Sequence, residues 1–114
     1  MSATGGAAQD RAEAAMQQIA ARALQSNVQR LTVLDGAVRA AGLGSLAEEE
    51  RSAASDVAHQ LVGSAGTFGY RQVSELARGL ERFFRDQDYD PAVVEKVTEQ
   101  IAVMQQDLQA EPDD

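Results

Sequence analysis

The stretch LAEEERSAASDVAHQLVGSAGTF, residues 46–68, decides the fold class of this chain of 114 residues. On a helical wheel with about 100° per residue, its apolar side chains collect on one side. These side chains belong to Ala53, Ala54, Val57, Leu61, Ala65 and Phe68. Ser45 and Glu48 have the Ser-x-x-Glu spacing of a capping box, and two more acids follow where the positive end of a helix favours them. The stretch therefore predicts an amphipathic helix from Leu46 to about Ala65.

A long helical region is predicted before this helix. Apolar residues recur at steps of three to five from residue 8 to residue 41, and Gly42 marks the end of the pattern. The polar run Gln25, Ser26 and Asn27 leaves open whether the region is one helix or two. The small residues ahead of it predict a flexible N-terminus over residues 1–7.

Two further helices are predicted after it. One runs from about Tyr70 to Arg85, and Asp90 followed by Pro91 opens the other, because an acidic N-cap and a proline at the first helical position favour a helix start. Short connections make consecutive helices antiparallel neighbours. We therefore expect an all-α fold, an up-and-down antiparallel four-helix bundle with an extra or extended N-terminal helix, over residues 8–109. An acidic disordered tail is expected over residues 110–114.

The composition excludes several classes of partner. The formal net charge of -8 opposes binding to nucleic acid and to anionic membranes, both of which need clustered Lys and Arg. The absence of cysteine excludes disulfides and thiolate chemistry. No stretch approaches the roughly 20 apolar residues that span a bilayer, and the first ten residues lack the features of a signal peptide. We expect a cytoplasmic monomer that binds neither nucleic acid nor membrane.

His59, the only histidine of the chain, falls on the side of the wheel opposite the apolar residues. Six residues share that side, most of them small or polar: Ser52, Ser55, Asp56, Val62, Gly63 and Gly66. A glycine inside a helix costs about 1 kcal/mol relative to alanine, so Gly63, one turn after His59, needs a reason. It either makes room for a partner or phosphoryl group beside the imidazole, or packs against another helix of the bundle.

Residues 59–69, HQLVGSAGTFG, resemble the phosphoacceptor motif of histidine-phosphotransfer (Hpt) domains. The ending Gly66-Thr67-Phe68-Gly69 looks most like the phosphotransfer domain of chemotaxis histidine kinases. The resemblance implies that His59 is the phosphoacceptor. In the chemotaxis version, a glutamate 22 residues beyond the histidine binds the ring nitrogen that does not react, and this position is Glu81 here. Glu81 would then orient the imidazole, the alternatives being a solvated carboxylate or an i,i+4 partner of Arg85.

Val62 departs from the family pattern, which usually has Lys or Arg three residues after the histidine. That cation helps to neutralise the phosphoryl group. Arg78, one turn before Glu81, is the nearest candidate to replace it. A docking patch around the histidine is expected to include Ser55, Gln60, Val62, Gly63 and Gly66.

The resemblance implies a phosphocarrier, not an enzyme in its own right, in a two-component phosphorelay. His59 would accept a phosphoryl group from a receiver aspartate or a sensor histidine kinase and pass it to a response regulator. The chain would need no cofactor of its own, since the partner's receiver domain is expected to supply Mg²⁺. No ligand spacing indicates a metal site. Two other possibilities are open: a receiver-binding adaptor with this fold that is never phosphorylated, and an unrelated helical scaffold or oligomerisation module.

Overall fold

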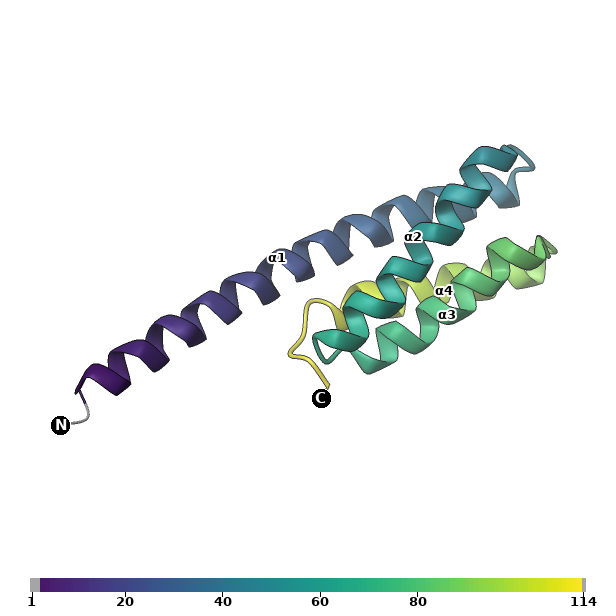
Figure 1. Ribbon diagram of the computed structural model, residues 1–114. Helices are drawn as coiled ribbons and strands as arrows, with labels where there is room; N and C mark the ends of the chain where they lie inside the picture. The colour runs from purple at the N-terminus through teal and green to yellow at the C-terminus, as the bar shows by residue number, and fades with distance from the viewer. Residues whose placement is uncertain (1–2, 114) are drawn as a thin grey trace.

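The structure is a computed structural model that describes residues 3–113 and contains four α-helices (Figure 1). In chain order they are α1 (Ala3–Gly42), α2 (Glu48–Thr67), α3 (Arg71–Asp86) and α4 (Pro91–Asp107). No strand occurs within this range. Three short loops connect the helices, and Figure 1 shows that each helix runs back along the one before it. The predicted all-α class is therefore confirmed.

The helices form a ring in which each contacts its neighbours in the chain and α4 contacts α1. Over the described part of the chain, no Cα atom of α1 lies within 8 Å of one in α3, and the same holds for the other diagonal pair, α2 and α4. This arrangement is an up-and-down four-helix bundle, as the short loops predicted.

The core is aliphatic, with two phenylalanines packed edge to face at one end. From α2, it contains Ala54, Ala58, Leu61 and Ala65. The predicted stripe is therefore wrong at its edges: Ala53 is exposed, Val57 and Phe68 are only partly buried, and Ala58 was omitted. The reason is that α2 packs between α1 and α3, which centres its buried face on Ala54, Ala58, Leu61 and Ala65.

Helix α1 is one continuous helix of 40 residues. The polar run does not break it, because Asn27 continues the buried stripe of α1 and its amide donates to the Ser64 hydroxyl of α2 at 3.1 Å. The helix begins at Ala3, five residues before the expected start and inside the segment expected to be flexible. Extending an existing helix avoids the nucleation cost, which allows the helix to include residues 3–7 despite Gly5 and Gly6. Met1 and Ser2 lie outside the described residues.

The N-terminal half of α1 extends well beyond the other three helices (Figure 1). Every residue from Gly6 to Ile19 is exposed, and from Gly6 onward Asn27 is the first buried residue. We call residues 3–22 the projection.

The start of α2 differs from the sequence expectation. The helix begins two residues later than Leu46, and Ala47 is its N-cap residue. The Ala47 N–H donates to the Glu50 carboxylate at 3.0 Å, whereas the Ser45 hydroxyl donates to the carbonyl of Ala40 at the end of α1. The predicted pairing of Ser45 with Glu48 is therefore wrong, because Ser45 instead binds the end of the preceding helix.

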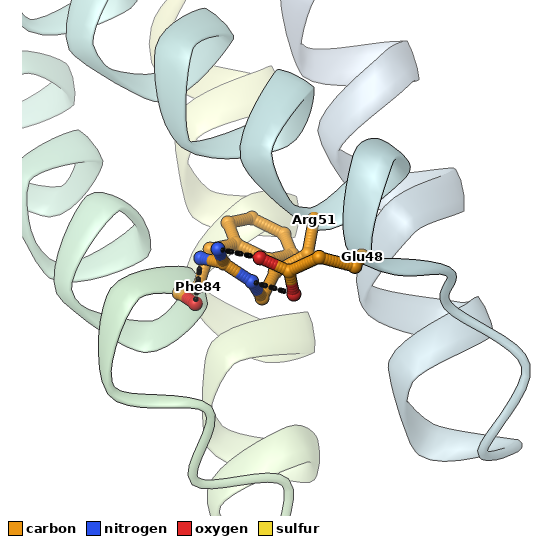
Figure 2. Close-up of polar contacts among 3 residues, drawn as sticks. All are labelled: Glu48, Arg51 and Phe84. Atoms are coloured by element: carbon orange, nitrogen blue, oxygen red, sulfur yellow. Dashed lines mark hydrogen bonds and ion pairs between the residues drawn. The ribbon is translucent and has the colours of Figure 1, made fainter.

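Glu48 has a different partner, which ties the start of α2 to the end of α3 (Figure 2). The Arg51 guanidinium binds both carboxylate oxygens of Glu48 and donates to the Phe84 carbonyl at 3.1 Å. The hydrogen bond from Arg51 lowers the pKa of the Glu48 carboxyl. The Phe84 carbonyl belongs to the last turn of α3, where carbonyls lack helical partners. Arg51 thus fixes the angle between the two helices that carry the candidate site.

The C-terminal segment also makes a defined contact, although a disordered tail was expected there. The Asp113 carboxylate accepts hydrogen bonds from the backbone N–H groups of Arg71 and Gln72, at 2.9 and 3.3 Å. Burial raises the pKa of Asp113, but these backbone donors outweigh burial and lower it overall. An acidic side chain is favoured here because the first N–H groups of α3 have no helical acceptors. Asp114 lies outside the described residues.

Candidate functional site

His59 lies on the outer face of α2, and its side chain is 74% exposed. Its Nδ1 is 3.1 Å from Oε2 of Glu81, on α3. The Glu81 side chain is 25% exposed. The structure therefore brings together the two residues that the sequence singled out, and does so at the surface.

Small residues beneath the pair explain how the two side chains meet. Ala58 precedes His59 and Ala77 lies one turn before Glu81, and both alanines are completely buried. Alanines at a helix contact allow a short distance between helix axes. At this separation, a glutamate on α3 reaches the imidazole on α2 without leaving its own helix. The packing of the bundle thus sets the geometry of the pair.

The hydrogen bond decides which ring nitrogen can react. A carboxylate only accepts hydrogen bonds, so Nδ1 of His59 must carry the proton that Glu81 accepts. In the neutral ring this leaves Nε2 with the free lone pair. The exposed ring therefore presents a nucleophilic nitrogen on a helix held by the bundle.

The two glycines of the predicted patch have different environments. A Cβ added to Gly63 would meet nothing within 4 Å, so no contact of the chain itself requires glycine there. A Cβ added to Gly66 would lie 3.3 Å from the Ser74 hydroxyl oxygen. Gly66 therefore accommodates α3, which is a packing role beside any contact with a partner. The space beside His59 is open at Gly63.

The other predicted patch residues surround the histidine unevenly. Ser55 is half-buried, and Gln60 is exposed on the side of α2 that turns toward α1, about 100° from His59 on the wheel. Val62 is partly buried against the core, not a free apolar residue on the surface. Its carbonyl accepts a hydrogen bond from Ser74 at 2.8 Å.

Arg78 is exposed on α3, and its side chain makes no hydrogen bond or ion pair with any residue that the structure describes. Its level along α2 is nevertheless defined. One turn before it, Ser74 binds the Val62 carbonyl, and one turn after it, Glu81 binds His59. Arg78 therefore lies beside the turn of α2 that runs from His59 to Val62.

The sequence analysis missed a polar link on the other flank of α2. The Asn27 amide donates to Ser64, and its own oxygen accepts from Arg30 at 2.7 Å. Ser64 belongs to the motif that starts at His59, and Asn27 is 1% exposed. The spacing of Asn27 from Leu31, which continues the buried stripe, is the signal that could have revealed it. The link joins the motif to α1.

The described residues contain neither a cluster suited to a metal ion nor a helix suited to crossing a membrane. Between residues 3 and 113, no group of three or more His, Cys, Asp or Glu side chains could hold a metal ion. No helix in the same part of the chain combines the length and apolar character needed to cross a membrane.

Comparison with known proteins agrees with the site. The model of the Hpt domain family matches residues 7–111, which include all four helices apart from the first residues of α1. No curated protein and no solved structure matches the chain. The match covers most of the chain and supports a histidine-phosphotransfer role in a phosphorelay. The closer resemblance to the chemotaxis kinases stays a prediction. The chain belongs to the Hpt domain family, whose members are phosphocarriers that interact with the receiver domains and kinases of two-component systems.

Proposed function

We propose that this protein carries a phosphoryl group on Nε2 of His59, taking it from a receiver aspartate or a kinase and passing it to a response regulator. The observation that carries the proposal is the exposed imidazole whose other nitrogen lies 3.1 Å from Glu81. A solvated surface histidine would not need a carboxylate from a second helix to fix its tautomer.

The transfer step uses few groups of this chain. The Nε2 lone pair attacks phosphorus, the bond from phosphorus to the aspartyl oxygen breaks, and the receiver regains its carboxylate. As the N–P bond forms, the ring gains positive charge, which the Glu81 carboxylate stabilises through the Nδ1–H. The interaction therefore strengthens toward the transition state, where it accelerates the reaction most. The receiver would supply Mg²⁺ and most of the stabilisation of the transferring group.

Access to His59 supports the same role. The ring is exposed, and Gly63 leaves the surface one turn further along α2 without a side chain. A mid-helix glycine that nothing inside the protein requires costs about 1 kcal/mol, which the fold tolerates without any gain in packing. Close approach of a receiver to this turn explains why the glycine is present.

Arg78 would supply the cation that the family usually places at the position of Val62. Its exposure and its level beside the turn from His59 to Val62 support this role. Arginine suits this task because its planar group binds phosphate oxygens in pairs.

The experiment is phosphorylation of the purified protein by a panel of phosphorylated receivers. The proposal expects phosphate that is labile in acid and stable in base on the wild type and none on His59→Gln. Equal labelling of the two proteins would overturn it.

A receiver-binding adaptor is the second candidate, and the observation in its favour is Val62 in place of the usual cation. An adaptor would bind a receiver with similar affinity before and after His59→Gln and would never acquire phosphate. The labelling experiment, repeated beside a binding measurement, distinguishes the two roles.

A further inference from the structure

Helix α1 carries two heptad stripes. One is buried in the core of the bundle, and the other is exposed or half-buried. The buried stripe has a spacing that alternates between four and three: Asn27, Leu31, Leu34, Val38 and Ala41. One residue before each of these lies a second stripe with the same spacing, which continues into the projection. We call it the outer stripe: Ala12, Met16, Ile19, Ala23, Ser26, Arg30, Val33, Ala37 and Ala40. A spacing of this kind is the seam of a helix that packs against another helix.

Among the described residues, no helix packs against the N-terminal part of the outer stripe, whereas Ala37, toward its other end, is partly buried against the core. Met16 is 69% exposed, and Ile19 and Val33 are each 55% exposed. The stripe is about 42 Å long, since 28 residues separate its ends and each rises about 1.5 Å. Exposed apolar residues are ordinary singly, but a regular row of them along one helix marks an interaction surface.

The C-terminal half of the stripe borders a groove between α1 and α2. The groove has a volume of about 330 Å³ and is lined by Val33, Gly36, Ala37, Ala40, Leu46, Glu50, Ala53 and Ala54. A Cβ added to Gly36 would meet nothing within 4 Å. The two halves of the stripe are therefore complementary in size, with Met16 and Ile19 on the projection and small residues beside the groove.

We infer that the outer stripe is a dimer surface, on which the projection of one copy lies antiparallel in the groove between α1 and α2 of a second copy. An alignment centred on Ser26 places Ile19 opposite Val33 of the second copy, Met16 opposite Gly36 and Ala37, and Ala12 opposite Ala40. The large side chains of each projection then fill the groove of the other copy. Because the arrangement is two-fold symmetric, it closes as a dimer.

Charge favours this occupant and this direction. Residues 3–26 contain Asp10 and Glu13 but also Arg11 and Arg22, so the whole net charge of -8 resides on the bundle. An antiparallel pair keeps the two acidic bundles at opposite ends, whereas a parallel pair would place them side by side. The neutral projection is the part of the chain that approaches a second acidic bundle without repulsion.

The size of the contact is sufficient for a specific pair. A strip about 42 Å long and about 10 Å wide on each copy, with the flank of α2 added, approaches the roughly 1,000 Å² of a small specific interface. Polar residues lie at its centre: Ser26 faces itself, and Arg30 faces Arg22 of the second copy, a like-charge contact that lowers the affinity of the pair. His59 lies about 120° around α2 from Ala53 in the groove, so dimerisation leaves it accessible.

Sedimentation equilibrium of the full chain tests the dimer. We expect twice the chain mass at micromolar concentration, and at least a hundredfold weaker association for Ile19→Glu, which buries an unpaired charge. Gly36→Gln should also dissociate the dimer by occupying the groove without disturbing the fold. Val103→Glu, a matched change at an exposed apolar residue of α4, should leave the mass unchanged. A wild-type chain that stays monomeric, or one that the Ile19 and Gly36 changes leave dimeric, would overturn the inference.

Disulfide cross-linking tests the direction, since the chain has no cysteine of its own. Ser26→Cys should cross-link to itself at the two-fold axis. Ile19→Cys alone should not, but a mixture of Ile19→Cys and Val33→Cys chains should form the mixed disulfide. Ready cross-linking of Ile19→Cys to itself would indicate a parallel pair and contradict the antiparallel arrangement.

Discussion

The Nδ1 of His59, on α2, lies 3.1 Å from the Oε2 of Glu81, on α3. The pair joins two helices whose relative position is supported by buried alanines below it and by Arg51 of α2, which binds the Phe84 carbonyl at the end of α3. An imidazole held in one tautomer by a neighbouring helix loses little entropy when it reacts. The packing of α2 against α3 therefore holds the His59 imidazole in its reactive orientation.

Replacing Glu81 should slow the transfer without unfolding the protein. A hydrogen bond to a charged group contributes about 1.5–3 kcal/mol, and exposure of the ring reduces this toward 1.4 kcal/mol, which is about tenfold in rate. We therefore expect Glu81→Gln to transfer phosphate about ten times more slowly in single-turnover measurements with a phosphorylated receiver. Glu75→Gln, at an exposed position of the same helix, is the control. Equal rates for the two variants would mean that Glu81 has no orienting role.

Substitutions of Gly63 should have separate effects on the free energy of unfolding and on the rate of phosphoryl transfer. Because nothing lies within 4 Å of an added Cβ, Gly63→Ala should raise the free energy of unfolding by about 1 kcal/mol. Gly63→Leu should remain folded but slow transfer by tenfold or more, since its side chain would stand between His59 and the receiver. Gly79→Ala, on α3, should change stability alone. Urea denaturation and single-turnover transfer measure the two effects, and an unchanged rate for Gly63→Leu would show that the receiver does not approach this turn.

Arg78 should contribute to the transfer rate and to the stability of the phosphohistidine, because Val62 stands where the family usually has a cation. Arg78→Gln is expected to slow transfer severalfold and to shorten the lifetime of the phosphohistidine. Val62→Lys in the same background should restore most of the loss, because the lysine stem can keep the apolar contact while its ammonium reaches the phosphoryl group. Arg82→Gln serves as the control on α3. The idea fails if Arg78→Gln and Arg82→Gln behave alike.

The link between Asn27 and Ser64 should contribute to stability. Asn27→Ala leaves the half-buried Ser64 hydroxyl without its donor and removes packed atoms, at a cost of about 1–3 kcal/mol. Ser64→Ala should cost less, and the double variant should cost less than the sum of the two, because the residues interact directly. Urea denaturation of the four proteins measures this coupling. Strictly additive losses would show that the hydrogen bond makes no net contribution.

Much of the bundle could be predicted from the sequence, because apolar periodicity and helix-start residues are local signals. The start at Asp90 is one example, since its carboxylate accepts from the Ala92 N–H at 3.1 Å. The pairing of His59 with Glu81 could be anticipated only through the resemblance to the Hpt family, since no local pattern reports the distance between two helices.

Other features depend on tertiary contacts that the sequence does not display. Ser45 could have capped either the helix before it or the helix after it, and only the loop geometry decides. Asn27 looked like a break in α1 because its partner, Ser64, is 37 residues away. The two glycines of the motif look alike in sequence, yet Ser74 packs at Gly66 and nothing packs at Gly63.

The central claim is that the phosphoryl group is carried on Nε2 of His59, and nitrogen-detected NMR of the phosphorylated protein tests it most directly. With ¹⁵N-labelled histidine, the account predicts coupling of phosphorus to Nε2 of the single imidazole, while Nδ1 keeps its proton toward Glu81. Phosphorus bonded to Nδ1, or a phosphorylated protein whose imidazole nitrogens show no coupling to phosphorus, would contradict it.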